Sequence, residues 1–384
     1  MVTLGTEGPL HAVLEQQIEI PFAWTDGMVY LHVENPGSAY SLWLNDRQVA
    51  EVSDPLTPAE FDLTPFIREG ANDFKLLMRN DNPARQLDAA APVVRKSFEN
   101  SYLYYQNKRS IADFEIGLVP DSLGRDFGML DLKIVTQNAY NYEEPVTVGY
   151  DIYSPQGKLL EFNMTEITIP GRSTDTVRFS PFIYHTYKNK WEAGSKTPPL
   201  YKVMLFTRRN GVYKEYMPLK IGFGKTELVD GRLTRFDKEL KLVKAGYNAA
   251  ADRKTTLAEL KTLKAKGNNT ICPDYPQPGW FYDLCDELGL YVIDCANINA
   301  PEKRDDRKVG GTPSNDPSLA DEYLERVKAM YYRSRNHSCV IAFALGGESG
   351  NGYNMYKAYE WLKSVEKSRP VICADADGEW NSDL

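Results

Sequence analysis

The chain is poor in the residues that build transition-metal sites and disulfide frameworks. It contains four histidines and five cysteines among 384 residues, and no cysteine pair has the spacing of a zinc motif. All five cysteines lie in the last third of the chain, and most stand in or beside predicted strands. We therefore expect buried free thiols and no bound transition metal.

Long apolar runs and an excess of positive charge are also missing. No stretch reaches the roughly 18 apolar residues that a bilayer-spanning helix needs. Residues 1–7 lack the basic and apolar regions of a signal peptide, and the sequence leaves the cellular location open. The net charge of −8 argues against a nucleic-acid partner, because nucleic acids attract basic surfaces.

Short alternating segments dominate the first 221 residues. Apolar and polar residues alternate over 29–33, 41–44 and 146–153, and turn signals separate such segments. Strands at this spacing predict two β-sandwich domains. We expect a jelly-roll-like sandwich over residues 1–110 and an immunoglobulin-like sandwich over residues 111–221.

The pattern changes to alternating strands and helices over residues 222–384. Residues 257–264 have the spacing of an amphipathic helix, whereas 290–294 and 339–345 are apolar runs typical of buried strands. This alternation predicts parallel βα units with about five strands, and a closed eight-stranded barrel needs roughly 250 residues. The fold class is therefore multidomain β plus α/β, with an incomplete (β/α) barrel. An open parallel sheet has uncovered edges, so we expect a homo-oligomer or an edge covered by the β-domains.

The clearest functional signal is a carboxylate set among glycines. The apolar run 339–345 ends at the sequence Gly-Gly-Glu-Ser-Gly, in which the acid is Glu348. Parallel α/β barrels build their active sites at the carboxyl ends of the strands. Glu348 is therefore the first candidate for a functional side chain.

Several short motifs follow one another along the chain. They are residues 38–45 with 58–65, Trp191 with 199–201, 221–223 through 230–231, 284–294, 333–337 and 346–350. In this order the motifs resemble glycoside hydrolase family 2, the family of the large β-galactosidases and β-glucuronidases. The resemblance implies a sugar-binding β-domain, a middle β-domain and a catalytic barrel that acts on β-linked carbohydrate.

By this resemblance Glu348 occupies the position of the general acid/base. Retaining glycosidases hold a second carboxylate, the nucleophile, roughly 5 to 5.5 Å from the first. In the family this nucleophile lies on a later strand than the five predicted for this chain. We therefore expect a protein that lacks hydrolase activity as this chain and that binds carbohydrate weakly or serves as a scaffold.

Several positions depart from the family pattern. Gly347 stands where the family has an asparagine, and residues 249–251 are all alanine where the family has polar side chains. At the magnesium site that the resemblance implies, Asn299 and Pro301 replace two ligands and leave Glu348. One carboxylate is a poor magnesium site, so we expect no cofactor.

Polar and aromatic residues near the predicted strand ends are candidates for sugar contacts. These candidate substrate-binding residues are Asp274, Trp280, Asp294, Asn297 and Asn354. Two other interpretations stay open. The chain is either a retaining β-glycosidase completed by a further C-terminal part or a partner chain, or a decayed product without a selected activity.

Overall fold

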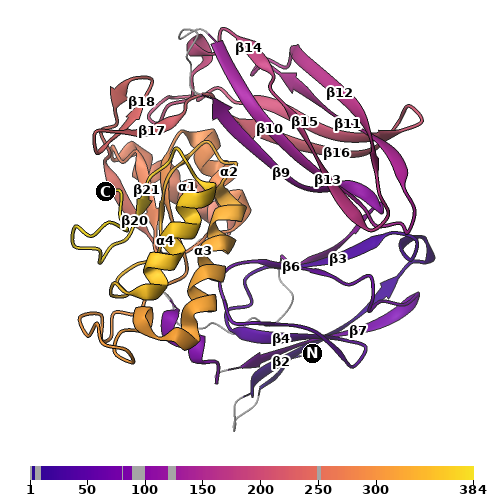
Figure 1. Ribbon diagram of the computed structural model, residues 1–384, viewed down its shortest axis with the longest axis horizontal. Helices are drawn as coiled ribbons and strands as arrows, with labels where there is room; N and C mark the ends of the chain where they lie inside the picture. The colour runs from indigo at the N-terminus through magenta and orange to yellow at the C-terminus, as the bar shows by residue number, and fades with distance from the viewer. Residues whose placement is uncertain (1, 5–9, 80, 89–99, 120–126, 249–251) are drawn as a thin grey trace.

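The computed structural model describes residues 2–4, 10–79, 81–88, 100–119, 127–248 and 252–384. Figure 1 shows two all-β parts and a third part in which helices pack around a parallel sheet. The multidomain β plus α/β fold class is therefore confirmed. None of the helices in these ranges combines the length and apolar character needed to span a bilayer.

The first β-sandwich packs a five-stranded sheet, in the order β1-β2-β7-β4-β5, against a three-stranded sheet, β6-β3-β8. Its core is apolar because inward residues alternate along the strands, as for Leu42 and Leu44 on one sheet and Leu31 on the other. The strands are β1 (Val2–Leu4), β2 (Leu10–Ile20), β3 (Met28–Val33), β4 (Ala39–Leu44), β5 (Arg47–Val52), β6 (Ala59–Asp62), β7 (Gly70–Arg79) and β8 (Tyr102–Gln106).

The second β-sandwich has two four-stranded antiparallel sheets. In one sheet β10 pairs with β9 and also with β13 and β14, and the other sheet has the order β12-β11-β15-β16. The first of these strands begins at Arg109, slightly before the domain start predicted at residue 111. The strands are β9 (Arg109–Val119), β10 (Phe127–Asn138), β11 (Glu144–Tyr153), β12 (Leu159–Ile169), β13 (Ser173–Phe179), β14 (Phe182–Tyr184), β15 (Tyr201–Arg209) and β16 (Val212–Ile221).

A short antiparallel sheet, β17-β18-β19, leads into five parallel strands in the chain order β20-β21-β22-β23-β24. Among the described residues one α-helix lies between each successive pair of parallel strands, as the sequence predicts, and two short 3-10 helices precede the α-helix between β22 and β23. The strands are β17 (Thr226–Val229), β18 (Arg232–Arg235), β19 (Lys238–Glu239), β20 (Lys244–Tyr247), β21 (Thr270–Pro273), β22 (Tyr291–Cys295), β23 (Val340–Ala344) and β24 (Val371–Ile372). The helices are α1 (Arg253–Ala265), α2 (Gly279–Leu288), α3 (Ala320–Ser334) and α4 (Tyr353–Val365).

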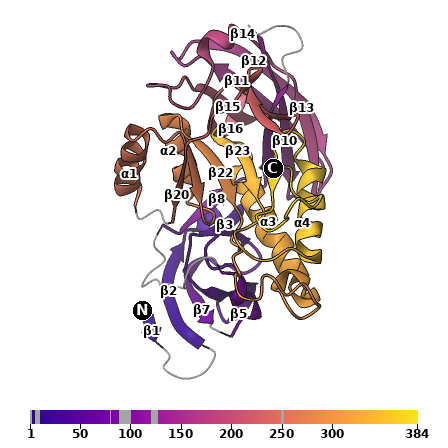
Figure 2. The same cartoon turned by 90° about the vertical axis from the view of Figure 1, so that its left-hand side faces the viewer.

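Local sequence signals set the limits of two of these helices. The side chain of Asp252 accepts hydrogen bonds from the backbone N–H groups of Lys254 and Thr255, which caps the start of α1. Helix α2 ends at Gly289, whose φ of 65° lies in the left-handed region that favours glycine. Strand β22 follows directly and is the middle strand of the parallel sheet, next to β23 (Figure 2).

The outer edge of β24 is contacted by residues near the C-terminus. The backbone N–H of Asp383 donates to the carbonyl of Val371 at 2.8 Å, and its side chain accepts from the N–H of Val371. Tyr359 and Lys363 on α4 also donate to the Asp383 carboxylate. The chain thus covers part of this edge itself, and the expected homo-oligomer stays a prediction.

A buried arginine joins the first sandwich to the parallel sheet. The side chain of Arg326 on α3 is 1% exposed and forms a 3.0 Å ion pair with Asp88. Its guanidinium also donates to the backbone carbonyls of Asn297, at 2.6 Å, and of Ala84. Ala84 and Leu87 belong to the same apolar core as the parallel strands. The segment after β7 is therefore part of the α/β core.

The Asp88 carboxyl group is strongly affected by this burial. Burial raises the pKa of Asp88 to about 7, although the Arg326 guanidinium acts in the opposite direction. Ionised Asp88 is therefore tolerated in the folded protein because Arg326 faces it.

We predict that Arg326→Met lowers the free energy of unfolding by about 3–5 kcal/mol at pH 8, because it removes the buried cation that forms the ion pair with Asp88. The loss should shrink as the pH falls toward 5. A carboxyl whose folded pKa lies above its unfolded value is destabilising when ionised, and protonation removes that effect. Urea denaturation at both pH values measures the difference.

Lys328→Met is the matched control, because Lys328 also lies on α3 and its ammonium group pairs with the exposed Glu325. This control should change the unfolding free energy by less than about 1 kcal/mol. An equal effect of the two substitutions at both pH values would contradict the role given to Arg326.

Candidate functional site

Loops at the carboxyl ends of the parallel strands gather the candidate side chains. Asp274 follows β21, Asn297 follows β22, Glu348 follows β23 and Asp375 follows β24. Because neighbouring parallel strands end at the same edge of a sheet, these loops lie on one face.

Glu348 lies in an ion pair on this face. Its side chain is 63% exposed, and Oε2 lies 2.8 Å from Nη1 of Arg304 in the loop after β22. Nη2 of Arg304 lies 3.8 Å from Oδ1 of Asp375, so the guanidinium stands between two carboxylates. The hydrogen bond with Glu348 raises the pKa of Arg304, so this cation stays charged.

Asp375 also fixes the loop that carries Glu348. Its Oδ2 accepts hydrogen bonds from the backbone N–H groups of Ser349 and Gly350, each at 2.7 Å. The backbone carbonyl of Glu348 accepts from the N–H of Ala300 at 3.0 Å. The loop is therefore held in place from two neighbouring strand ends.

The residues at the implied magnesium site do not fit that ion. Asn299 offers an amide instead of a carboxylate, and a Cβ added at Gly347 would lie 3.4 Å from its Cγ. The remaining acid, Glu348, is already paired with Arg304. Magnesium binds through carboxylates and water in near-octahedral geometry, which this donor set does not supply.

Three of the predicted sugar contacts are buried inside the protein, namely Asp294, Asn297 and Asn354. Asp294 accepts a 2.8 Å hydrogen bond from the hydroxyl of Tyr282 on α2. The amide of Asn354 donates to the carbonyls of Pro313 and Asp316. These side chains face the helices and neighbouring turns, which does not agree with the expected contact to a ligand.

Asn297 has a comparable structural role. Its side chain is buried, and Nδ2 donates to Oδ1 of Asp54 in the first sandwich at 2.8 Å. Asp274, in contrast, is exposed, and Trp280 is partly exposed and packs against the core. Of the predicted site residues, these two and Glu348 remain accessible. Residues 249–251, the alanine run, lie outside the described residues.

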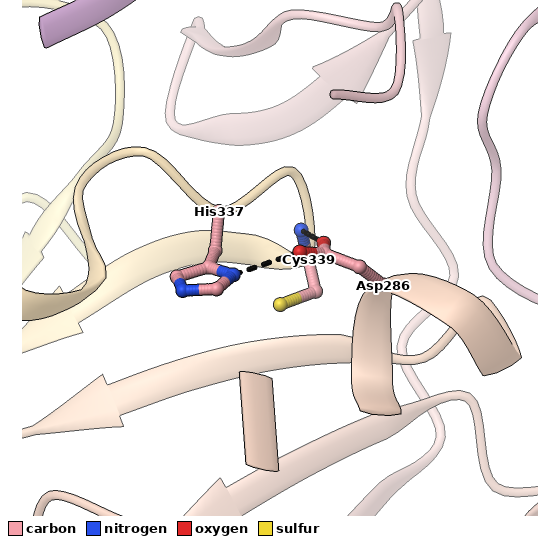
Figure 3. Close-up of side chains that lie close together, drawn as sticks. All are labelled: Asp286, His337 and Cys339. Carbon is pink, nitrogen blue, oxygen red and sulfur yellow. Dashed lines mark hydrogen bonds and ion pairs between the residues drawn. The ribbon is translucent and has the colours of Figure 1, made fainter. Parts of the chain in front are cut away.

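A second group of chemically capable side chains lies near the amino end of β23. Asp286 on α2 lies 2.8 Å from Nδ1 of His337, and its other oxygen accepts from the backbone N–H of Cys339 (Figure 3). The donor atoms of the three residues lie within 4.8 Å of one another, a distance compatible with a metal ion. Burial raises the pKa of the Cys339 thiol well above its usual range, and both Asp286 oxygens already accept hydrogen bonds. The cluster therefore anchors α2 to β23.

The preceding residues attach the second sandwich to the same end of the sheet. Arg335 donates to the carboxylate of Asp113 at 2.7 Å and to the carbonyl of Phe114 at 2.8 Å. The side chain of Asn336 accepts from the backbone N–H of Ile116. The motif at 333–337 thus joins two domains, a role that its sequence alone does not reveal.

Comparisons with known proteins agree with this arrangement. The description "Glycosyl hydrolases family 2, sugar binding domain" matches residues 6–88, and "Glycosyl hydrolases family 2, TIM barrel domain" matches residues 247–383. With its β-domains and partial parallel barrel in the family order, the chain belongs to glycosyl hydrolase family 2.

Its relatives include bacterial β-galactosidases. The chain is 29% identical over 353 residues to a β-galactosidase of Vibrio cholerae, an alignment that covers 87% of this chain and 33% of the relative. For a β-galactosidase of Lactococcus lactis the identity is 28%, with 92% of this chain and 34% of the relative covered. The chain therefore spans about a third of the length of these relatives.

Solved structures support the fold. A putative β-galactosidase from Bacteroides fragilis superposes with a TM-score of 0.80 at 14% identity, covering 96% of this chain and 56% of that protein. A β-glucuronidase from Bacteroides uniformis gives a TM-score of 0.78 at 16% identity, covering 95% and 46%.

We predict that Asp286→Asn lowers the unfolding free energy by about 1–3 kcal/mol, because the amide cannot serve both His337 and the Cys339 backbone as the carboxylate does. Thermal denaturation at neutral pH measures the effect. Asp283→Asn on the exposed side of α2 is the control and should leave the midpoint nearly unchanged. Equal midpoints for the two variants would contradict the anchoring role.

Proposed function

We propose that this 384-residue chain binds carbohydrate weakly at the carboxyl end of its parallel strands and does not hydrolyse glycosides. The observation that carries the proposal is the 2.8 Å ion pair between Arg304 and Glu348. A general acid needs its carboxyl group within hydrogen-bond reach of the leaving-group oxygen. Arg304 occupies Oε2 of Glu348, which opposes the role that the family position gives to this residue.

The other carboxylate near Glu348 is also occupied. Asp375 accepts two backbone hydrogen bonds and faces Arg304, an arrangement that suits a loop support better than a nucleophile. The nucleophile of the family lies on a later strand than β20–β24. Gly347 in addition lacks the side-chain amide of the family asparagine, which removes a hydrogen bond to a sugar hydroxyl.

The accessible side chains suit a sugar. Trp280 offers part of an indole ring, and Asp274 and Glu348 offer oxygen acceptors on the same face. An aromatic surface with a few polar groups is a common arrangement in small-ligand sites. Because few hydrogen-bonding groups remain, the affinity should be low.

We predict no measurable hydrolysis of nitrophenyl β-galactoside, β-glucuronide or β-mannoside by the purified chain. The reason is that the described residues do not provide two carboxylates, one as acid/base and one as nucleophile, that are both free of other partners. Turnover that disappears in Glu348→Gln would contradict this prediction, because that loss excludes a contaminating glycosidase.

We predict millimolar binding of galactose, glucuronate or a short β-linked oligosaccharide, measured by NMR titration. Loss of about three hydrogen bonds, each worth roughly 0.5–1.5 kcal/mol, weakens a family-like site by about one to three orders of magnitude. Trp280→Ala and Glu348→Ala should each reduce the chemical-shift changes. Tyr142→Ala, an exposed aromatic of the second sandwich, should not.

If no sugar causes shifts at tens of millimolar, or if Trp280→Ala and Glu348→Ala bind as the parent chain does, the face is not a carbohydrate site. The first sandwich, which matches the sugar-binding domain description, would then be the next location to test.

One observation favours a second candidate, a retaining β-glycosidase completed by further residues. The chain spans about a third of the β-galactosidases that it resembles. Co-expression of this chain with polypeptide that carries the later barrel strands tests this candidate. Activity that Glu348→Gln abolishes would support it, and activity that increases in Arg304→Ala would show that the ion pair restrains the acid.

A further inference from the structure

A cavity of about 320 Å³ lies at the opposite end of the parallel strands from Glu348. It is bounded by β9 and β10 of the second sandwich, by the segment after β16, and by the turns that precede β23 and follow α4. Figure 1 shows β9 and β10 beside the helical part of the molecule on this side. The volume is within the range of cavities that hold small ligands.

Most charged groups that line the cavity are already paired. The pairs are Glu115–Lys133, Asp131–Arg178, Lys225–Glu227, Arg335–Asp113, Glu366–Arg369 and His337–Asp286. Two lining cations, Arg235 and Lys367, have no carboxylate within 4.0 Å in the described part of the chain. The lining therefore carries two positive charges without an ion-pair partner among the described residues, and Nζ of Lys367 donates only to a backbone carbonyl there, that of Lys363.

Arg235 is the more unusual of the two cations. Its side chain is 4% exposed and lies over the ring of Trp191, with the guanidinium carbon 4.9 Å from the ring centroid. Nε donates to the carbonyl of Gly224 at 2.7 Å, but Nη1 has no partner among the described residues. Burial lowers the pKa of Arg235, although Tyr291 acts in the opposite direction, as do Glu192 and Asp286 from a greater distance than an ion pair.

Two further buried groups that line the cavity also lack partners in the described structure. They are the hydroxyl of Thr226 and Nε of Arg335, both on residues that are more than nine-tenths buried. Guanidinium N–H groups only donate, and a hydroxyl donates readily to an anion. Unsatisfied donors together with unbalanced positive charge match a ligand that accepts hydrogen bonds and carries negative charge.

We propose that this cavity binds a tetrahedral oxyanion, a phosphate or sulfate group, either free or as an ester. Arg235 and Lys367 supply the balancing charge, and Thr226 and Arg335 supply further hydrogen-bond donors. A dianion would neutralise the two unpaired cations. The site is separate from the carbohydrate face, so this inference does not rest on the proposed function.

Titration calorimetry of the full chain with inorganic phosphate, against sodium chloride at equal ionic strength, tests the proposal. We expect saturable phosphate binding and none for chloride. Arg235→Gln and Lys367→Ala should each weaken it by about tenfold or more, because each removes a charged partner of the anion. Lys357→Ala, the same change near the start of α4, is the control and should bind as the parent chain does.

Lys367 is exposed, so Lys367→Ala remains informative even if Arg235→Gln fails to fold. No saturable binding of phosphate or sulfate would overturn the proposal. Unchanged affinity in Lys367→Ala, or an equal loss in Lys357→Ala, would also overturn it. A parallel titration with glucose 6-phosphate separates the sources, since binding of phosphate alone indicates a free anion and binding of both indicates a site open to esters.

Discussion

The buried guanidinium of Arg326 is the interaction on which the arrangement of this protein depends. It lies between α3 and the first sandwich, and it satisfies the Asp88 carboxylate and backbone carbonyls from both sides of that junction. A buried charge is tolerated only when such partners surround it. The position of the first sandwich relative to the strand ends is therefore specified by hydrogen-bond geometry in addition to apolar contact.

Arginines occupy the other junctions as well, with different consequences. Arg335 attaches the second sandwich through Asp113 and a backbone carbonyl, so its charge is balanced. Arg235 lies near the same junction with aromatic rings beside it and no carboxylate partner in the described residues. Arg335, which is paired with a carboxylate, holds two domains together. Arg235, which has no such pair, is a candidate for binding an anion.

At the opposite end of the sheet a third arginine pairs with the carboxylate of Glu348. Arg304 reaches Glu348 from a loop that has no regular secondary structure, and Asp375 holds the Glu348 loop from β24. The family resemblance implies other polar groups at the positions of Gly347 and Asn299. Under the function proposed above, these differences and the ion pair belong to a domain that still has to fold but in which the demand for catalysis is relaxed.

The sequence alone determined the alternation of strands and helices, because apolar periodicity and glycine stops act locally. It predicted five parallel strands, and it placed Glu348 at the end of one of them. It also carried the family resemblance, because that depends only on the order of motifs along the chain.

Tertiary structure decided which side chains of the strand ends are accessible. Asp294 and Asn354 stand near strand ends in the sequence, yet their orientation toward helices and turns follows from packing against Tyr282 and Pro313. The Arg304–Glu348 pair joins residues from two separate loops, and the cavity beside Arg235 joins two domains. No local pattern encodes such contacts, because each forms only after elements distant in the sequence have packed together.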